Sequence, residues 1–456
     1  MNRITGRAGV VLVLVATLAA GFGFFLCEYM VESRNWVVTQ GSPHVYVSGS
    51  DPKCGVVTDR NGLLLMDTRN EKRFTNDSLL RMSIVHWLGD RAGNVNAPII
   101  PGYAQYVFDY DLLNGVYQYG NSKGVITTTL SAEVQKTALE ALGDYKGTVA
   151  VYNYRTGELI CAVSTPTFDP DHVPDVTADD SYEGVYLNRF IQSTYTPGSI
   201  FKIVTLAAAL ENISDIGTRS FYCTGTCSVD GGTVTCGDDV HYEQSLKMAF
   251  RNSCNCAFAQ IALELGAETL DRYIKQFGVT EPITIDGLVT ASGNVEVLNT
   301  ADVNVAWSAV GQYKNQINPC TFLTFVGAVA NDAEPIFPYL VEQTAVGGSA
   351  TYTASVRSDD PIMDVTTAKT IQEFMRFNVT DKYGNEHFPG LTVCAKTGTA
   401  EVGGGKKPNA MLTGFVTDEK YPLAFIVCVE DGGYGKTVCI PIASEVLAAC
   451  KTEFDG

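Results

Sequence analysis

A serine and a lysine three positions apart, in Ser199-Ile200-Phe201-Lys202, form the first of three short motifs that could carry acyl-transfer chemistry. On a helix these two side chains share one face, so the Lys202 amine would stand beside the Ser199 hydroxyl. A serine hydroxyl becomes an effective nucleophile when a base removes its proton. A lysine amine can be that base if burial or a neighbouring cation lowers its pKa. We therefore predict Ser199 as a nucleophile and Lys202 as its base.

Two further motifs follow in the chain and supply other groups that such a reaction needs. Ser253-Cys254-Asn255 offers a second hydroxyl and an amide, and Lys396-Thr397-Gly398-Thr399 offers a second cation. Backbone N–H groups at a helix start bearing Ser199, and on a strand edge at Thr399, would form an oxyanion hole. Gly398 has no side chain, so substrate backbone could approach that strand closely.

Each motif has an ordinary interpretation when it stands alone. The first would be a residue near a helix start, the second a turn or cap, and the third a surface lysine at the end of a strand. In this order, and at these predicted positions, the three motifs together indicate the active site of a serine acyltransferase.

The segments around the motifs are predicted to bring them into one cleft. A turn at Pro197-Gly198 precedes apolar residues at positions 203, 206, 207 and 210, so a buried helix should run on from Ser199. Ser253-Cys254-Asn255 falls at the junction of two predicted helices. Residues 391–396 read as a strand that ends at Lys396.

The order of elements predicts the fold class. Residues 148–153 and 158–164 form a predicted hairpin, and residues 411–416 and 423–430 two more strands before a helix at 440–450. Upstream, helices are expected at Ser78–Leu88, with Ser78 as N-cap, and at 131–142. Antiparallel strands with flanking helices indicate an α/β fold of the mixed, α+β, type.

The N-terminus carries a predicted membrane anchor. Residues 8–26 are 19 residues without a charge, close to the roughly 20 that cross a bilayer. Arg3 and Arg7 precede this run and Glu28 follows it, so residues 1–7 should be cytoplasmic and the remainder outside. A cleaved signal peptide usually has a shorter apolar region. A lipid-modified Cys27 is disfavoured because Leu26 stands where a small residue is expected.

Composition excludes one class of partner and leaves the cysteines open. The formal net charge of −18 argues against nucleic acid. Thirteen cysteines are many for an exported chain, and five of them cluster: Cys223, Cys227, Cys236, Cys254 and Cys256. They could be small buried apolar residues, could include a Cys223–Cys236 disulfide, or could hold a metal. No C-x₂-C pair with matching histidines is present, so we assign no metal and no cofactor.

Further segments carry a family resemblance. Asp59-Arg60-Asn61-Gly62, residues 127–135, residues 150–170 and Pro197-Gly198-Ser199 resemble, with the three motifs, class B penicillin-binding proteins, which are peptidoglycan DD-transpeptidases. The resemblance implies a cytoplasmic tail (1–7), a transmembrane anchor (8–26), a short pedestal (27–145) and a transpeptidase domain (146–456) of the serine β-lactamase/DD-peptidase type.

The resemblance also implies roles for the motif residues. Ser199 would attack the penultimate D-alanine carbonyl of a stem peptide, with Lys202 as base. Ser253 would relay a proton to the leaving amine, and Asn255 would hold the substrate amide. An amine of a second stem peptide would then take the acyl group, and β-lactams would acylate Ser199.

The third motif is implied to bind the substrate. Lys396 would set the local potential, Thr397 and Thr399 would bind the terminal carboxylate, and Gly398 would line the site. The implied partners are stem peptides ending in D-Ala-D-Ala, β-lactams, the bacterial cytoplasmic membrane and a SEDS-family glycosyltransferase. The alternatives are a β-lactamase or DD-carboxypeptidase, and a non-catalytic activator of that glycosyltransferase.

Overall fold

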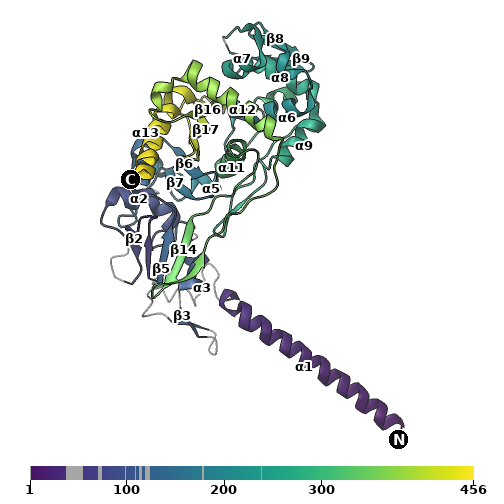
Figure 1. Cartoon of the computed structure of the whole chain (residues 1–456), viewed down its shortest axis with the longest axis vertical. Coiled ribbons are helices and arrows are strands. Elements are labelled where there is room, and N and C mark those ends of the chain that lie inside the picture. Colours follow the sequence, from purple (N-terminus) through teal and green to yellow (C-terminus); the bar gives the residue numbers. More distant parts are fainter. Residues whose placement is uncertain are drawn as a thin grey trace.

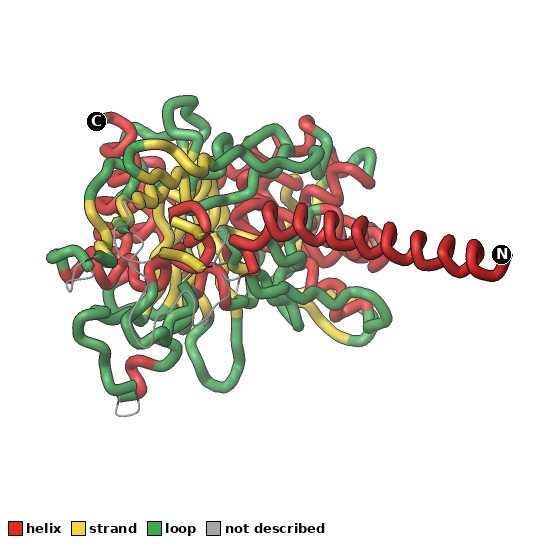
Figure 2. Tube along the Cα trace, turned by 90° about the horizontal axis from the view of Figure 1, so that it is seen from below, coloured by secondary structure: helices red, strands yellow, loops and turns green. Residues whose placement is uncertain are grey.

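A computed structural model describes residues 2–36, 55–69, 74–97, 99–107, 109–111, 116–118, 124–176, 179–237 and 239–456. Its centre is a five-stranded sheet in the order β16-β17-β18-β6-β7, in which every neighbouring pair is antiparallel. The strands are β6 (Gly147–Asn153), β7 (Leu159–Thr165), β16 (Val393–Ala400), β17 (Asn409–Val416) and β18 (Leu423–Val429). The predicted hairpin and the two later strands are therefore present, and strands gather at the middle of the body in Figure 2.

Helices cover both faces of this sheet, as the side-chain alternation of β6 requires. Val149 and Val151 enter one buried core with α4 (Ala132–Leu142) and α13 (Gly435–Asp455). Ala150 and Tyr152 point to the opposite face and enter a second core with α11 (Pro319–Ala330). Successive residues of a strand face opposite sides, so an apolar strand without polar alternation must be covered twice. The predicted fold class, an antiparallel sheet flanked by helices, is confirmed.

A mostly helical region lies beside the sheet and carries the first two motifs. It contains η2 (Gly198–Phe201), α6 (Lys202–Asn212), α7 (Leu246–Asn252), α8 (Asn255–Leu265), α9 (Ala267–Gln276), α10 (Asp302–Ala309) and α12 (Val365–Asn378). Two small hairpin-like pairs, β8 (Ser220–Cys223) with β11 (Tyr242–Ser245) and β9 (Thr226–Val229) with β10 (Gly232–Thr235), lie at the far end of this region in Figure 1.

Short elements connect these parts. They are α5 (Arg189–Gln192), β12 (Thr284–Ile285), β13 (Leu288–Val289), the 3₁₀ turns η1 (Asp180–Tyr182), η3 (Ile216–Thr218) and η5 (Asn385–His387), and the π-helical turn η4 (Val379–Tyr383).

A second sheet joins distant parts of the chain. Its order is β15-β14-β5-β1-β2, with β1 (Val56–Thr58), β2 (Leu64–Asp67), β5 (Gly124–Thr128), β14 (Val341–Val346) and β15 (Ser349–Thr353). Figure 1 shows it below the central sheet, with α2 (Ser78–Leu88) and α3 (Ile99–Val107) against it and β3 (Asp109–Asp111) and β4 (Val116–Gln118) beyond. Two of its strands thus come from residues 341–353, in the later part of the chain.

Two helix starts show how local capping works here. The predicted N-cap Ser78 is wrong, because Asp77 is the cap and its carboxylate accepts from the N–H groups of Leu79 and Leu80. A carboxylate satisfies two unpaired N–H groups and favours the positive end of the helix. Ser131 caps α4 by accepting from Val134 N–H. Helix α4 then packs on β7 and α13, so it is part of the cover of the central sheet.

The N-terminal helix α1 (Asn2–Trp36) projects away from the body in Figures 1 and 2. Its segment Ile4–Ser33 contains an 18-residue stretch with a mean hydropathy of 2.6, and none of that stretch is buried against the body. Length and composition are therefore sufficient for one membrane crossing. The helix is longer than the uncharged run at 8–26 because the polar residues on both sides of that run are also helical.

Trp87 joins α2 to the central sheet. Its ring is completely buried, and its Nε1–H donates to Ala162 O at 2.7 Å. We expect Trp87→Ala to lower the free energy of unfolding by about 3–5 kcal/mol, the usual cost of truncating a buried tryptophan. Denaturant-induced unfolding of the full chain measures this, with Trp36→Ala as control because Trp36 is 50% exposed on α1. Equal stability of the two variants would contradict the assigned packing.

Candidate active site

The first motif begins at a sharp turn that presents Ser199 to a cleft. Gly198 has φ +55, and a Cβ there would lie 2.6 Å from Thr399 O, so only glycine fits between the turn and β16. Ser199 lies in η2 and is partly exposed, and α6 follows directly at Lys202. The predicted helix start is confirmed, with its first turn wound as a 3₁₀ helix. Lys202 Nζ lies 3.0 Å from Ser199 Oγ.

The surroundings of Lys202 suit a neutral amine. The side chain is completely buried, and Nζ lies 2.6 Å from both Ser253 O and Asn255 Oδ1. Both of these oxygens can only accept hydrogen bonds. A neutral amine has two N–H groups for them and one lone pair left, which faces the Ser199 hydroxyl. Burial lowers the pKa of Lys202 to about 7, so this form is available near neutral pH.

Ser253 stands between the two lysines of the site. Its Oγ is 3.2 Å from Lys202 Nζ and 3.0 Å from Lys396 Nζ. The residue has φ +61, an uncommon left-handed conformation for a side chain other than glycine. This conformation ends α7 and starts α8, which confirms the predicted helix junction. Asn255 at the start of α8 donates from Nδ2 to Thr235 O at 2.7 Å.

Lys396 and Lys382 place two further amines close to Lys202. Lys396 is completely buried, and burial lowers its pKa well below the ordinary value, with further lowering by Lys202 and Lys382. Burial also lowers the pKa of Lys382, whose Nζ donates to Arg251 O at 3.2 Å. Buried amines without carboxylate partners are costly, and such perturbed groups concentrate at functional sites.

The prediction that the strand ends at Lys396 is wrong, because β16 continues through the whole motif to Ala400. The register pairs Lys396 with Thr413 and Ala400 with Asn409 of β17. The structure also gives a reason for Gly398 other than approach of substrate. A Cβ at this position would lie 2.7 Å from Pro197 O, so the glycine lets β16 pack closely on the Ser199 turn.

The two threonines of the third motif have different surroundings. Thr397 N–H donates to the hydroxyl of Tyr383 at 3.1 Å, and that hydroxyl lies 3.0 Å from Thr397 Oγ1. The Tyr383 proton can therefore go to Thr397 Oγ1. Thr399 lines a cleft of about 490 Å³ together with Ser199 and Asn255. The structure thus brings all three motifs together around one opening.

Several residues around this opening carried no sequence signal. Trp307, Gln312 and Tyr313 line the cleft, and Gln312 Nε2 lies 3.5 Å from Thr399 O. Gly311 permits this arrangement, since a Cβ there would lie 1.9 Å from Gly198 O. In the sequence, the one local sign of this part of the site was the glycine of Gly311-Gln312, just after a segment that can be predicted as a helix. Lys382 and Tyr383 lie in a π-helical turn that no local pattern indicates.

Residues 147–448 match the family described as penicillin binding protein transpeptidase domain. This chain belongs to that family. Peptidoglycan D,D-transpeptidase PbpA of Mycolicibacterium smegmatis is 30% identical over 364 residues, covering 72% of this chain and 73% of that protein. PBPA of Mycobacterium tuberculosis is 26% identical in its crystal structure, with a TM-score of 0.73 over 87% of this chain and 98% of that one. Its penicillin G acyl-enzyme complex is 25% identical, with a TM-score of 0.72 over 88% and 100%.

Membership of the penicillin-binding transpeptidase family confirms the predicted recognition and the predicted enzyme class, a serine transpeptidase. It also agrees with the geometry, in which a partly exposed serine hydroxyl meets a buried lysine amine at the edge of an antiparallel sheet. The roles of individual side chains rest on that geometry.

Proposed function

We propose that this chain is a peptidoglycan DD-transpeptidase that cross-links stem peptides through an acyl-enzyme on Ser199. The observation that carries the proposal is the completely buried Lys202 amine, 3.0 Å from Ser199 Oγ and held by two carbonyl oxygens. These contacts leave its lone pair for the serine proton, which is the requirement for an activated nucleophile.

The first step forms a bond between Ser199 Oγ and the carbonyl carbon of the penultimate D-alanine, and the Ser199 proton moves to Lys202 Nζ. Backbone N–H groups of Ser199 and Thr399 bind the oxyanion that develops. Asn255 holds the substrate amide, because its Nδ2 and Oδ1 are already oriented by Thr235 O and Lys202. The proton that Lys202 takes gives its amine a positive charge, which favours the negatively charged intermediate.

The second step breaks the carbon–nitrogen bond and releases D-alanine. The leaving nitrogen needs a proton, and Ser253 Oγ lies between Lys202 and Lys396 at 3.2 and 3.0 Å. Ser253 gives its proton to the leaving amine and receives the one that Lys202 took. An amine of a second stem peptide then attacks the ester, loses one proton to the same groups and restores the Ser199 hydroxyl.

The terminal carboxylate of the donor peptide should bind at the third motif. Thr397 and Thr399 offer hydroxyl groups along β16, next to the Lys396 ammonium or amine. Gly398 lines this part of the site through its backbone. A carboxylate gains from the hydroxyl donors, and it favours the protonated form of the neighbouring Lys396 amine.

Topology relative to the membrane is part of the same proposal. Arg3 and Arg7 before the apolar run favour a cytoplasmic N-terminus, so the residues after α1 lie outside a bacterial cytoplasmic membrane, where peptidoglycan is built. We divide them into a pedestal (27–145), to which β14 and β15 add two strands, and a transpeptidase domain (146–456). Cross-linking acts on glycan strands that a polymerase makes, and a SEDS-family glycosyltransferase is the partner that we propose.

The test uses the full chain in detergent with a peptide ending in D-Ala-D-Ala and a D-amino acid in excess as acceptor. We expect one exchanged peptide for each D-alanine released, detected by mass spectrometry. Release of D-alanine with water as the only acceptor would instead identify a DD-carboxypeptidase. Rapid turnover of penicillin to its hydrolysed form would identify a β-lactamase.

The proposal predicts a pH dependence for the acylation of Ser199 by penicillin. Only the neutral Lys202 amine can accept the proton, and its pKa is about 7. The second-order acylation rate should therefore fall about tenfold per pH unit well below 7 and level off above it. Charged or titratable groups that influence Lys202 are Lys382, Lys396, Cys236, Cys254 and Cys256. A rate that is constant through pH 7, with the protein folded throughout, would exclude Lys202 as the base.

A further inference from the structure

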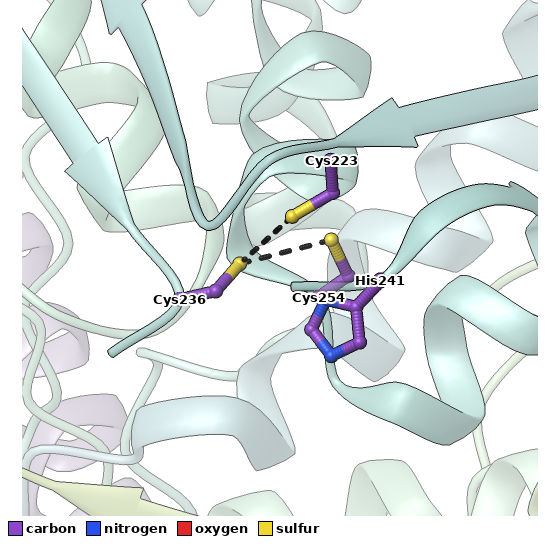
Figure 3. Close-up of side chains that lie close together, drawn as sticks. All are labelled: Cys223, Cys236, His241 and Cys254. Atoms are coloured by element: carbon purple, nitrogen blue, oxygen red, sulfur yellow. Dashed lines mark hydrogen bonds between the residues drawn. The ribbon is translucent and has the colours of Figure 1, made fainter. Parts of the chain in front are cut away.

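Three cysteines and a histidine from separate segments meet beside the second motif (Figure 3). Cys223 ends β8, Cys236 follows β10, His241 precedes β11, and Cys254 lies between α7 and α8. One ring nitrogen of His241 and the three sulfur atoms all lie within 4.8 Å of one another. These are the donor types that zinc prefers, and four of them complete a structural zinc site.

The distances between the sulfur atoms fit a tetrahedron around one metal ion. Cys236 Sγ lies 3.7 Å from Cys223 Sγ and 3.7 Å from Cys254 Sγ. A tetrahedron with zinc–sulfur bonds of about 2.3 Å has sulfur–sulfur edges of about 3.8 Å. A disulfide needs about 2.05 Å, and Cys223 and Cys236 are free thiols in the structure. The disulfide alternative is thus not the arrangement present.

Each of the three sulfur atoms also accepts a hydrogen bond from the backbone. Gly225 N–H donates to Cys223 Sγ, Cys256 N–H to Cys236 Sγ and Ala257 N–H to Cys254 Sγ, each at 3.4 Å. Such donors stabilise the charged thiolate, which is the form that binds metal. Buried cysteines that serve only as apolar filling have no need of them.

His241 supplies an independent sign of an absent partner. Its Nδ1 is buried and has no hydrogen-bond partner among the residues that the structure describes. A buried ring nitrogen normally has a partner, because leaving it unsatisfied costs free energy. A metal ion in the middle of the cluster would be a partner for a nitrogen of the His241 ring.

We propose that Cys223, Cys236, His241 and Cys254 bind one zinc ion. Binding displaces the protons of the three thiols, and the four protein ligands leave no position for a water, so the site is structural. Cys256 supplies a fourth nearby sulfur, 3.6 Å from Cys236 Sγ. It stays outside the ligand set because its S–H group faces Val234 O at 3.9 Å and so keeps its proton.

The ion would fix the second motif in place. Isolated two-stranded pairs such as β8–β11 and β9–β10 are marginally stable, and the ion would join both of them to the start of α8. Cys254 lies between Ser253 and Asn255, and Cys236 follows Thr235, whose carbonyl oxygen accepts from Asn255 at 2.7 Å. Asn255 is thus held from two sides, through its chain neighbour Cys254 and through Thr235, the chain neighbour of Cys236, and the ion would bind both cysteines. This makes Cys254 a positioning residue.

Metal analysis of the full chain tests this inference without any measurement of activity. After purification in detergent without chelator, we expect about one zinc per chain. Replacement of zinc by cobalt(II) should give the intense visible absorption of a tetrahedral thiolate site, which needs no variant. The proposal would be overturned if the chain held less than about 0.1 zinc per chain both before and after incubation with zinc. A mass two hydrogens lower, with Cys223 and Cys236 linked, would overturn it too.

Variants assign the ligands. Cys223→Ser and Cys254→Ser should each lose at least about tenfold in zinc affinity, whereas Cys227→Ser, in the same segment but outside the four, should retain the ion. A Cys227→Ser chain that loses zinc as completely as Cys223→Ser would overturn the assigned set. Because zinc content is measured directly, the site can fail this test while the transpeptidase reaction stands, and the reverse.

Removal of the ion should also lower the rate of acylation by penicillin. A chelator should slow penicillin acylation of the parent chain at least about tenfold, and added zinc should restore the rate. The Cys227→Ser control should respond in the same way as the parent. An acylation rate that is unchanged by removal of a bound zinc would overturn the positioning role of Cys254.

Discussion

The Ser199→Ala chain is expected to lose penicillin labelling and transpeptidation together. Alanine removes the hydroxyl whose oxygen lies 3.0 Å from Lys202 Nζ. No acyl-enzyme can then form, and the loss should be about 10⁶-fold, the scale found when a catalytic serine is removed. Time-resolved mass spectrometry with penicillin, and the exchange assay with a D-Ala-D-Ala peptide, measure the two losses.

Ser181→Ala is the matched control, because Ser181 is an exposed serine in another 3₁₀ turn. It should label and exchange as the parent does. The Ser199→Ala chain should unfold at the same temperature as the parent, since only one oxygen is lost. If cells that contain Ser199→Ala in place of the parent build their wall equally well, the essential role is that of an activator of a partner and not catalysis.

The second large effect is expected for Lys202→Met, which keeps the apolar stem but removes the amine. Acylation should slow by about 10²–10⁴-fold, the usual contribution of a general base. The residual rate would come from the oxyanion donors and from substrate binding. Rapid-mixing kinetics with penicillin check the change. Lys275→Met, at an exposed position of α9, should leave the rate unaltered.

Stability provides a second readout for the same variant. Lys202 is completely buried, and in the described part of the chain its amine contacts hydroxyl and carbonyl oxygens and no carboxylate. Burial of an amine costs free energy that a methionine does not incur, so Lys202→Met should unfold at the same or a higher temperature. A variant that is both inactive and clearly less stable would indicate that Lys202 holds the fold and does not act as a base.

Local sequence patterns predicted the helices and strands whose apolar residues show a regular spacing or form a short run. The helix after Ser199 follows from apolar spacing, and the strands of the central sheet follow from short apolar runs. The end of β16 was missed because its last four residues, Thr397–Ala400 in sequence order, owe their conformation to pairing with β17. The local sequence does not determine which distant strands pair.

The same limit explains what was missed in the site. The motif residues were found because their spacing is local. Gln312, which lines the cleft, and Lys382, which influences the two buried lysines, lie just after α10 and α12, and no motif encodes how these helices pack. The cysteine cluster was visible in the sequence, but its set of four metal donors was not, because Cys223, Cys236, His241 and Cys254 have no recognised ligand spacing. The pairing of β8 with β11, and of β9 with β10, helps to bring these donors together.

The central claim is that Ser199 is the residue that carries the acyl group. The most direct measurement is to treat the full chain with penicillin, digest it and map the adduct by tandem mass spectrometry. We expect one adduct per chain, on the Ser199 hydroxyl of the peptide that contains Pro197-Gly198-Ser199. An adduct on another side chain, Ser253 included, or no adduct on folded protein, would contradict it.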